Sequence, residues 1–152
     1  MSYSAADGRQ QVLDELATAV EEIAYALASL GEAYEQVDEI TGDTLEEELF
    51  GPVQKAFGRA RRTHSQFAER YGLQGREFEQ PPAGPPSLRA RGFVENASGA
   101  ASSAGGMLAT LQDSDVALEV GDQELRAGLA DVRALLDPVP SRARDLMRKL
   151  GR

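Results

Sequence analysis

The chain has 152 residues, enough for one domain that buries about two thirds of the surface of its unfolded state. It contains no Cys, which excludes disulfides, thiolate zinc sites and cysteine nucleophiles. No apolar stretch approaches the ~20 residues of a membrane span, and no basic-then-apolar run opens the sequence. We therefore expect a cytoplasmic protein without a membrane span.

The formal net charge is −9, and the acids are concentrated in the first half of the chain. Twelve acids and no Lys or Arg lie between Gln10 and Gln54. Residues 1–80 carry seven basic and sixteen acidic residues, whereas residues 81–152 carry nine of each. An acidic face repels phosphate backbones, so nucleic-acid partners are disfavoured and a solvated, solubilising face is the simpler interpretation.

Residues 5–40 are predicted to form the helix on which the others pack. Apolar residues recur there at spacings of three and four, which is a heptad pattern. Small residues flank this seam, and this favours a bundle with neighbours on more than one side over a two-stranded coiled coil. Ser4 and Asp7 resemble a capping box, and residues 41–43 are expected to end the helix. The seam consists of Leu13, Leu16, Val20, Ile23, Leu27, Leu30, Tyr34 and Val37.

A second helix, antiparallel to the first, is predicted to start at Asp43 as N-cap. Pro52 removes one backbone hydrogen bond, so we expect a kink near residues 50–51 or a short helix followed by a restart. Gly72 followed by Leu73 predicts a helix end with the glycine in the left-handed conformation. The seam of this helix is Leu45, Leu49, Val53, Ala56, Ala60, Thr63, Phe67 and Tyr71.

Residues 73–86 are predicted to be a linker, because their Pro-rich part favours polyproline II over helix or strand. At ~3.1 Å per residue such a linker spans roughly 43 Å, about the length of a 28-residue helix. It can therefore cross a bundle from end to end. A ligand for a domain with an aromatic groove is the alternative interpretation of the proline run.

Two further helices are predicted over residues 87–137. Ser87 is expected to cap the first, which runs to about Gln112. Its middle, residues 97–106, contains only Ala, Ser and Gly. Small residues weaken a helix but let another backbone approach, so tight packing on the first helix and disorder in the monomer both stay open. The second helix, capped by Asp113 or Ser114, is predicted to have a break at Gly121 and Asp122 and to end at Asp137 and Pro138. Its seam is Leu111, Leu118, Leu125, Leu129, Val132 and Leu136.

The fold class expected is all-α: a four-helix bundle of two helical hairpins joined by a Pro-rich crossover, with a short basic C-terminal helix. A single domain is expected over residues 1–152. Its parts are hairpin 1 (5–72), the linker (73–86), hairpin 2 (87–137) and the C-terminal helix (141–150).

The C-terminal segment suggests how the protein functions. Residues 142–152 contain five Lys or Arg and one Asp, a charge of +4. We expect this segment to dock on the acidic first hairpin of its own or a neighbouring chain. The predicted function is a non-enzymatic interaction or assembly module, as a homo-oligomer or as a subunit of a larger complex. The predicted contact residues are Arg142, Arg144, Arg148 and Lys149 against Glu46, Glu47 and Glu48.

No metal or cofactor site is predicted. Di-iron and di-manganese sites in helical bundles need two Glu-x-x-His motifs, but the chain has one His, and Arg61 stands three residues before it. A site for calcium or magnesium made of carboxylates alone stays open, although no Asp-rich loop is present. Gly-rich phosphate-binding loops are also absent from the sequence.

Arg59 and His64 fit the pattern Arg-x4-His, and this stretch of six residues resembles the motif of HEPN-type ribonucleases. The resemblance implies an all-α dimer in which Arg59 and His64 face the partner's pair and cleave RNA by acid–base chemistry. Lys55, Arg61 and Arg62 would then hold phosphates. A ribonuclease is therefore the alternative function, and a structural, partly exposed His64 is the simpler interpretation.

Tyr34 and Asp38 fit the Tyr-x-x-x-acid signal of the small helical-hairpin proteins of specialised actinobacterial secretion, which the segment resembles. Tyr3 and Asp7 fit it as well. The resemblance implies a substrate or accessory protein of such a secretion system, as a second alternative. The Trp-x-Gly turn of that family is missing, because the chain has no Trp.

Overall fold

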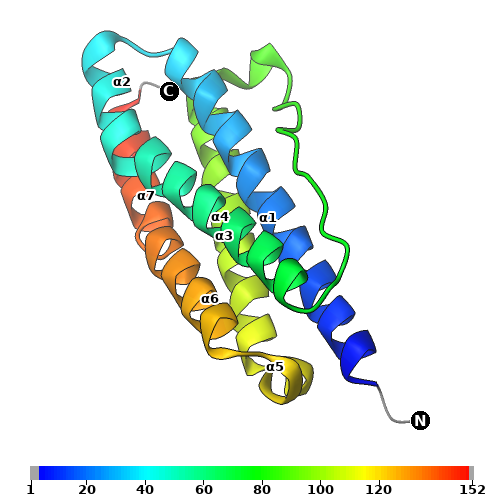
Figure 1. The fold of residues 1–152 in the computed structure, drawn as a ribbon. Helices are drawn as coiled ribbons and strands as arrows, with labels where there is room; N and C mark the ends of the chain where they lie inside the picture. Colours follow the sequence, from blue (N-terminus) through cyan, green and yellow to red (C-terminus); the bar gives the residue numbers. More distant parts are fainter. Residues whose placement is uncertain (1–3, 151–152) are drawn as a thin grey trace.

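The computed structural model describes residues 4–150, which form helices with no β-strand among them. The all-α prediction is confirmed. Four long helical segments lie side by side, and two short helices close opposite ends (Figure 1). The long segments are α1 (Ala5–Glu35), α3 (Gly51–Arg70), α4 (Arg89–Asp113) and the pair α6 (Gln123–Leu136) and α7 (Val139–Lys149). The short helices are α2 (Glu39–Leu45) and α5 (Asp115–Val120).

The most extensive packing joins α1 to α4 and α3 to α6. Each of these pairs links the first half of the chain to the second. The small-residue run 97–106 is an ordered part of α4, and its alanines at 97, 100, 101 and 104 are buried. Because these side chains are small, the backbones of α1 and α4 approach closely. Of the two outcomes left open by the sequence, tight packing is the one observed.

Helix α1 begins as predicted and carries the first six residues of its predicted seam. The Ser4 hydroxyl accepts a hydrogen bond from the Asp7 N–H at 3.1 Å, and the seam residues from Leu13 to Leu30 are buried. Its predicted end is wrong: α1 stops at Glu35 instead of residue 40, because Asp38 caps a new helix.

The predicted break at residues 41–43 is also wrong, since these residues lie inside α2. The Asp38 carboxylate accepts a hydrogen bond from the Thr41 N–H at 2.7 Å and is the N-cap, the role predicted for Asp43. The corner between α1 and α2 leaves Tyr34 44% exposed and Ile40 81% exposed. Tyr34 was expected in the buried seam, but the helix ends one residue after it.

The disturbance expected before Pro52 is a π-helical turn, η1 (Glu46–Phe50), in which the Gly51 N–H donates to the Glu46 carbonyl. Pro52 has no N–H, so the turn before it lacks one backbone donor. Arg142 of α7 supplies a donor instead, with its Nη1 at 3.3 Å from the Glu48 carbonyl oxygen. A distant helix thus compensates for the proline.

The predicted end of α3 is confirmed. Gly72 has a φ of 64°, and the Leu73 N–H donates to the Ala68 carbonyl at 2.8 Å, which is a Schellman cap. The crossover segment, residues 73–85, then has no regular secondary structure. Figure 1 shows it running beside α1 toward the opposite end of the molecule, the end-to-end crossing that its length allows.

Ser87 is not the cap of the next helix. It lies in a 3-10 turn, Pro86–Leu88, and α4 begins after this turn at Arg89. A proline at the first position suits such a turn, because its φ is fixed and its missing N–H would have no partner there. The C-terminal helix also starts earlier than predicted, at Val139, with Pro140 in its first turn.

The helix predicted after Ser114 is divided into two helices, α5 and α6, at the predicted break. Ser114 caps α5 as expected, and its hydroxyl accepts a hydrogen bond from the Ala117 N–H at 3.2 Å. The chain extends at Gly121, and Asp122 caps α6 by accepting from the Leu125 N–H at 2.8 Å. Leu118 of the predicted seam is 65% exposed, because α5 does not continue along the axis of α6.

Candidate functional site

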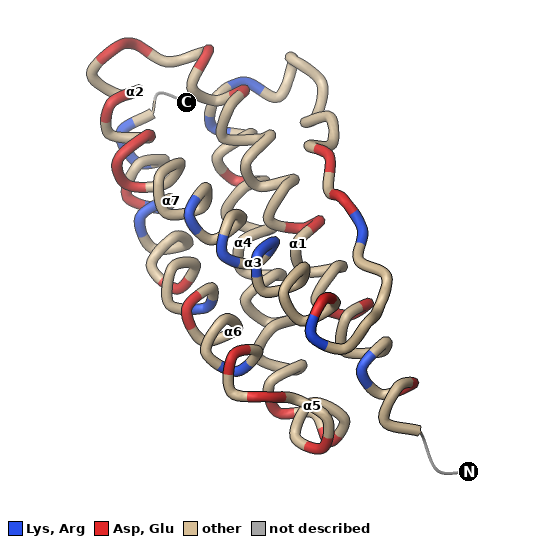
Figure 2. The backbone as a smooth tube through the Cα atoms, viewed as in Figure 1, with Lys and Arg blue, Asp and Glu red and all other residues tan. Residues whose placement is uncertain are grey.

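The predicted contact residues lie on η1 and α7, which touch each other at one end of the molecule. We call the exposed residues Glu46, Glu47, Arg144 and Lys149 the charged end. Figure 2 shows acidic and basic segments next to one another there. Acidic and basic groups thus occupy neighbouring elements of the same surface.

One ion pair within the chain joins a predicted basic residue of α7 to a predicted acid of η1. The Nε of Arg142 lies 3.2 Å from the Glu48 carboxylate, and both side chains are partly exposed. Since Arg142 also reaches the Glu48 carbonyl, it fastens α7 to the π-helical turn. Of the four predicted basic residues, Arg142 is therefore the one that pairs with a predicted acid of the first hairpin within the chain.

The other predicted residues are not joined to one another. Arg148 pairs with Asp145 of its own helix at 3.0 Å. Within the described residues 4–150, Arg144 and Lys149 form no ion pair, and neither do Glu46 and Glu47. These four charges are available to a partner. Ile40, with its high exposure, lies on α2, the helix that leads directly into η1.

Arg59 and His64 do not converge on a common site. Arg59 points to α6, where its Nε lies 3.0 Å from the Asp131 carboxylate. His64 is only 2% exposed, although partial exposure was expected for it. The ring of Phe78, from the crossover segment, packs edge-on against His64 at 5.0 Å between ring centroids. Neither side chain is presented to a partner in the way that the HEPN resemblance implies.

The surroundings of His64 favour its neutral form. Burial lowers the pKa of its imidazole, the positive charge of Arg76 lowers it further, and the carboxylate of Asp14 raises it by less. The Nδ1 atom is buried without a hydrogen-bond partner among the described residues. These properties describe a histidine packed under the crossover segment.

The Tyr-x-x-x-acid pattern falls on the corner between α1 and α2. Tyr34 is exposed, and the Asp38 carboxylate is engaged as the N-cap of α2. That capping bond from Thr41 lowers the pKa of Asp38 below its usual range. Tyr3, in the second match to the pattern, lies outside the described residues.

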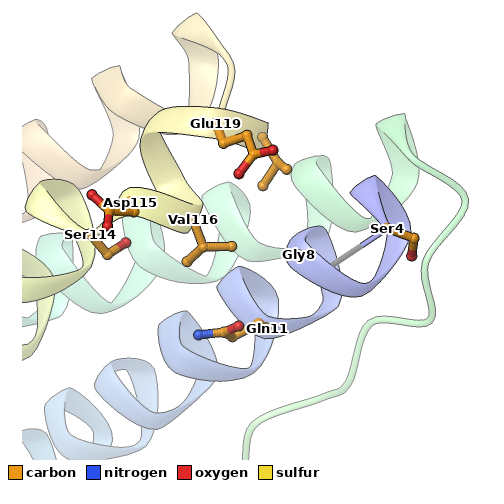
Figure 3. Close-up of a pocket in the computed structure, with 8 residues that line it drawn as sticks. Ser4, Gly8, Gln11, Ser114, Asp115, Val116 and Glu119 are labelled. Atoms are coloured by element: carbon orange, nitrogen blue, oxygen red, sulfur yellow. The ribbon is translucent and has the colours of Figure 1, made fainter. Parts of the chain in front are cut away.

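A pocket of about 350 Å³ lies between the first turns of α1 and α5. Figure 3 shows α5 lying across α1, with the side chains of Asp115 and Glu119 on α5 and that of Gln11 on α1. The two helices meet closely, since a Cβ on Gly8 would lie 3.1 Å from a methyl group of Val120. The lining combines carboxylates, hydroxyls and one amide, with no basic group to orient or activate them. We assign no chemistry to this pocket.

Sequence analysis missed a polar cluster around Asp122. Its carboxylate accepts two hydrogen bonds from Arg70, at 2.7 and 2.8 Å, and one from the Tyr71 hydroxyl at 2.8 Å. Partial burial raises the pKa of Asp122, but the bonds from Arg70, the Leu125 N–H and Tyr71 outweigh this and lower it overall. Arg9 lies 4.2 Å above the Tyr71 ring. The cluster joins the end of α3 to the start of α6, and the break predicted at Gly121 and Asp122 was its one trace in the sequence.

Two general features bear on the function. Within residues 4–150, no group of three or more His, Asp or Glu side chains is arranged to hold a metal ion. No helix among these residues has the length and apolar character needed to cross a membrane.

The chain was also compared with known proteins. No family model, no curated protein and no solved structure matches it.

Proposed function

We propose that this chain is a non-enzymatic protein-interaction module that assembles with a second copy of itself through the charged end. In this proposal the four long helical segments form a four-helix bundle that serves as a rigid support. The observation that carries it is the position of unpaired acids on η1 beside unpaired bases on α7, within the described residues.

A two-fold axis makes this arrangement self-complementary. When one surface carries an acidic patch next to a basic patch, the acids of each copy face the bases of the other, and both contacts form together. The ion pair between Arg142 and Glu48 is an example, within one chain, of a base of α7 pairing with an acid of η1. Exposed pairs contribute little individually, but complementary patches steer association and fix its register. Ile40 offers an apolar contact beside them.

The first test is the solution mass of the full chain, measured by light scattering at low and at moderate salt. We expect a dimer that dissociates as salt rises, because exposed charges are screened within about 10 Å at 0.1 M. A monomer at low salt would contradict self-assembly. A dimer that does not respond to salt would contradict the charged end as its contact.

Charge reversal identifies the surface. We expect Glu46→Lys with Glu47→Lys to abolish association, and Arg144→Glu with Lys149→Glu to do the same. A mixture of the two double variants should associate again, because each then supplies the charges that the other lost. Arg126→Glu, an exposed reversal on α6, is the matched control. If the mixture stays monomeric while the parent chain dimerises, the proposed contact is wrong.

A further inference from the structure

A second charged feature lies away from the charged end, in a hollow of about 390 Å³ between α3 and the crossover segment. Three arginines line it, two from α3 and one from the crossover segment, and the single acid in its lining is Glu77. The lining residues are Arg61, Arg62, Ser65, Arg76, Glu77 and Phe78. In a chain of net charge −9, such a concentration of guanidinium groups needs an explanation.

Two of the arginines are held in place by neighbours. Arg61 lies 4.9 Å above the ring of Phe57. Arg76 lies 2.7 Å from the Glu21 carboxylate and 5.7 Å from the centre of the Phe78 ring. Side chains that are already positioned lose less conformational entropy when a ligand binds. Two sides of the hollow are therefore partly organised before any ligand arrives.

The third arginine has donors to spare. Arg62 forms no ion pair and donates no side-chain hydrogen bond within the part of the chain that the structure describes. A guanidinium group presents several N–H donors in a planar fork, which matches the oxygens of a carboxylate or phosphate. The Ser65 hydroxyl lies in the same lining, and its O–H donates to the Arg62 carbonyl at 3.3 Å.

The wall supplied by the crossover segment is anchored in the core. Phe78 packs on the buried ring of His64, so the residues just before it are held against α3. The backbone at Gly75 also lies close to this histidine: a Cβ built on Gly75 would be 3.5 Å from the His64 ring. The hollow is thus formed by two segments that are fixed relative to one another.

We propose that this hollow binds a phosphate-type oxyanion, either inorganic phosphate or the phosphate group of a monoester. Arg76 is shared with the Glu21 carboxylate, but Arg61 and Arg62 form no ion pair among the described residues. These two free guanidinium groups suit a ligand with two negative charges and several oxygens. Because the arginines come from two segments, a bound anion bridges α3 and the crossover segment. The ligand therefore fastens the crossover segment to the bundle.

The test uses the full chain titrated with inorganic phosphate, followed by the amide signals in NMR spectra. Sodium chloride at equal ionic strength is the control for screening. We expect saturable shifts at residues 61–65 and 75–78 with phosphate and not with chloride. We also expect slower hydrogen exchange at residues 75–78, which a merely electrostatic background would not produce. Shifts that never saturate, or that chloride reproduces, would overturn the proposal.

Variants with opposite expected effects sharpen the result. Arg62→Gln should weaken phosphate binding by about tenfold, because a charged donor is lost. Glu77→Gln should strengthen it, because a repelling carboxylate is removed from the lining. Arg126→Gln, on α6, should leave it unchanged. Equal affinity in the Arg62 variant and the parent would overturn the site.

Phosphoserine provides the second arm of the titration. Tighter binding of phosphoserine than of inorganic phosphate would identify a monoester as the preferred source of the anion. Tighter binding of inorganic phosphate would identify the free ion. Failure of both would overturn the proposal while leaving self-assembly through the charged end intact, since the two sites share no residue.

Discussion

Removal of the Asp122 carboxylate is expected to destabilise the protein more than removal of an ordinary surface acid. The carboxylate caps α6, which contributes about 1 kcal/mol. It also accepts a hydrogen bond from Tyr71, worth about 1 kcal/mol. Its pair with Arg70 is partly exposed, so screening by solvent limits it to about 1 kcal/mol or less. Together these contributions amount to about 2 to 3 kcal/mol.

The assay is thermal and urea unfolding of the Asp122→Ala variant at pH 7, followed by circular dichroism. For a chain of this length, the expected loss lowers Tm by about 5 to 10 °C. The Asp122→Asn variant keeps an oxygen that can cap α6, and should recover about 1 kcal/mol of the loss. Arg70→Gln removes the ion pair and leaves the cap, so it should cost less than Asp122→Ala.

The same carboxylate should contribute to acid sensitivity. Its pKa is lowered in the folded chain, so the unfolded chain binds its proton more readily. The stabilisation is therefore present above the ordinary carboxyl pKa of about 3.9, and it is lost as the pH falls through the lower pKa of the folded state. The Ala variant should lose less stability than the parent over that range. If Asp122→Ala stays within about 0.5 kcal/mol of the parent at pH 7, the reasoning is refuted.

Three further outcomes are expected from unfolding experiments. Gly128→Ala should cost about 1 to 3 kcal/mol, because its Cβ would clash with the Thr63 hydroxyl of α3. Gly105→Ala, with open space around it, should gain about 0.5 to 1 kcal/mol, and equal effects of the two changes would contradict the close approach of α6 to α3. Because burial lowers the pKa of His64, the free energy of unfolding should fall as the pH drops below about 6.5, by at most about 1.4 kcal/mol per pH unit. The His64→Leu variant should lose this pH dependence, and a variant that keeps it would show that another group titrates. Arg142→Gln should cost about 1 kcal/mol in the parent, and less in a Pro52→Ala background, where residue 52 again has an amide N–H. Additive losses in the double variant would refute the idea that Arg142 replaces the donor missing at Pro52.

The local signals of the sequence determined several elements correctly. The heptad spacing from Leu13 to Leu30 defines a helix and its buried face, because periodicity follows from backbone geometry alone. The disturbance before Pro52 and the cap at Gly72 were also predictable, since both depend on the chemistry of one residue and its neighbours.

Boundaries that depend on a choice between neighbouring caps were less predictable. Asp38 and Asp43 are chemically equivalent, and only the path of the chain around the corner selects Asp38. Leu118 continues the heptad spacing, but Asp122 starts a new helix and leaves this leucine exposed. In each case the sequence offered two compatible structures, and packing of the helix ends decided between them.

The contacts between distant segments required the tertiary structure. The bonds of Arg70 and Tyr71 to Asp122 and of Arg142 to the Glu48 carbonyl, and the packing of Phe78 on His64, join residues with no signal at a fixed spacing. The charges at the two proposed sites were visible in the sequence. Their grouping depends on which helices lie side by side, because pairing and burial are properties of three-dimensional neighbours.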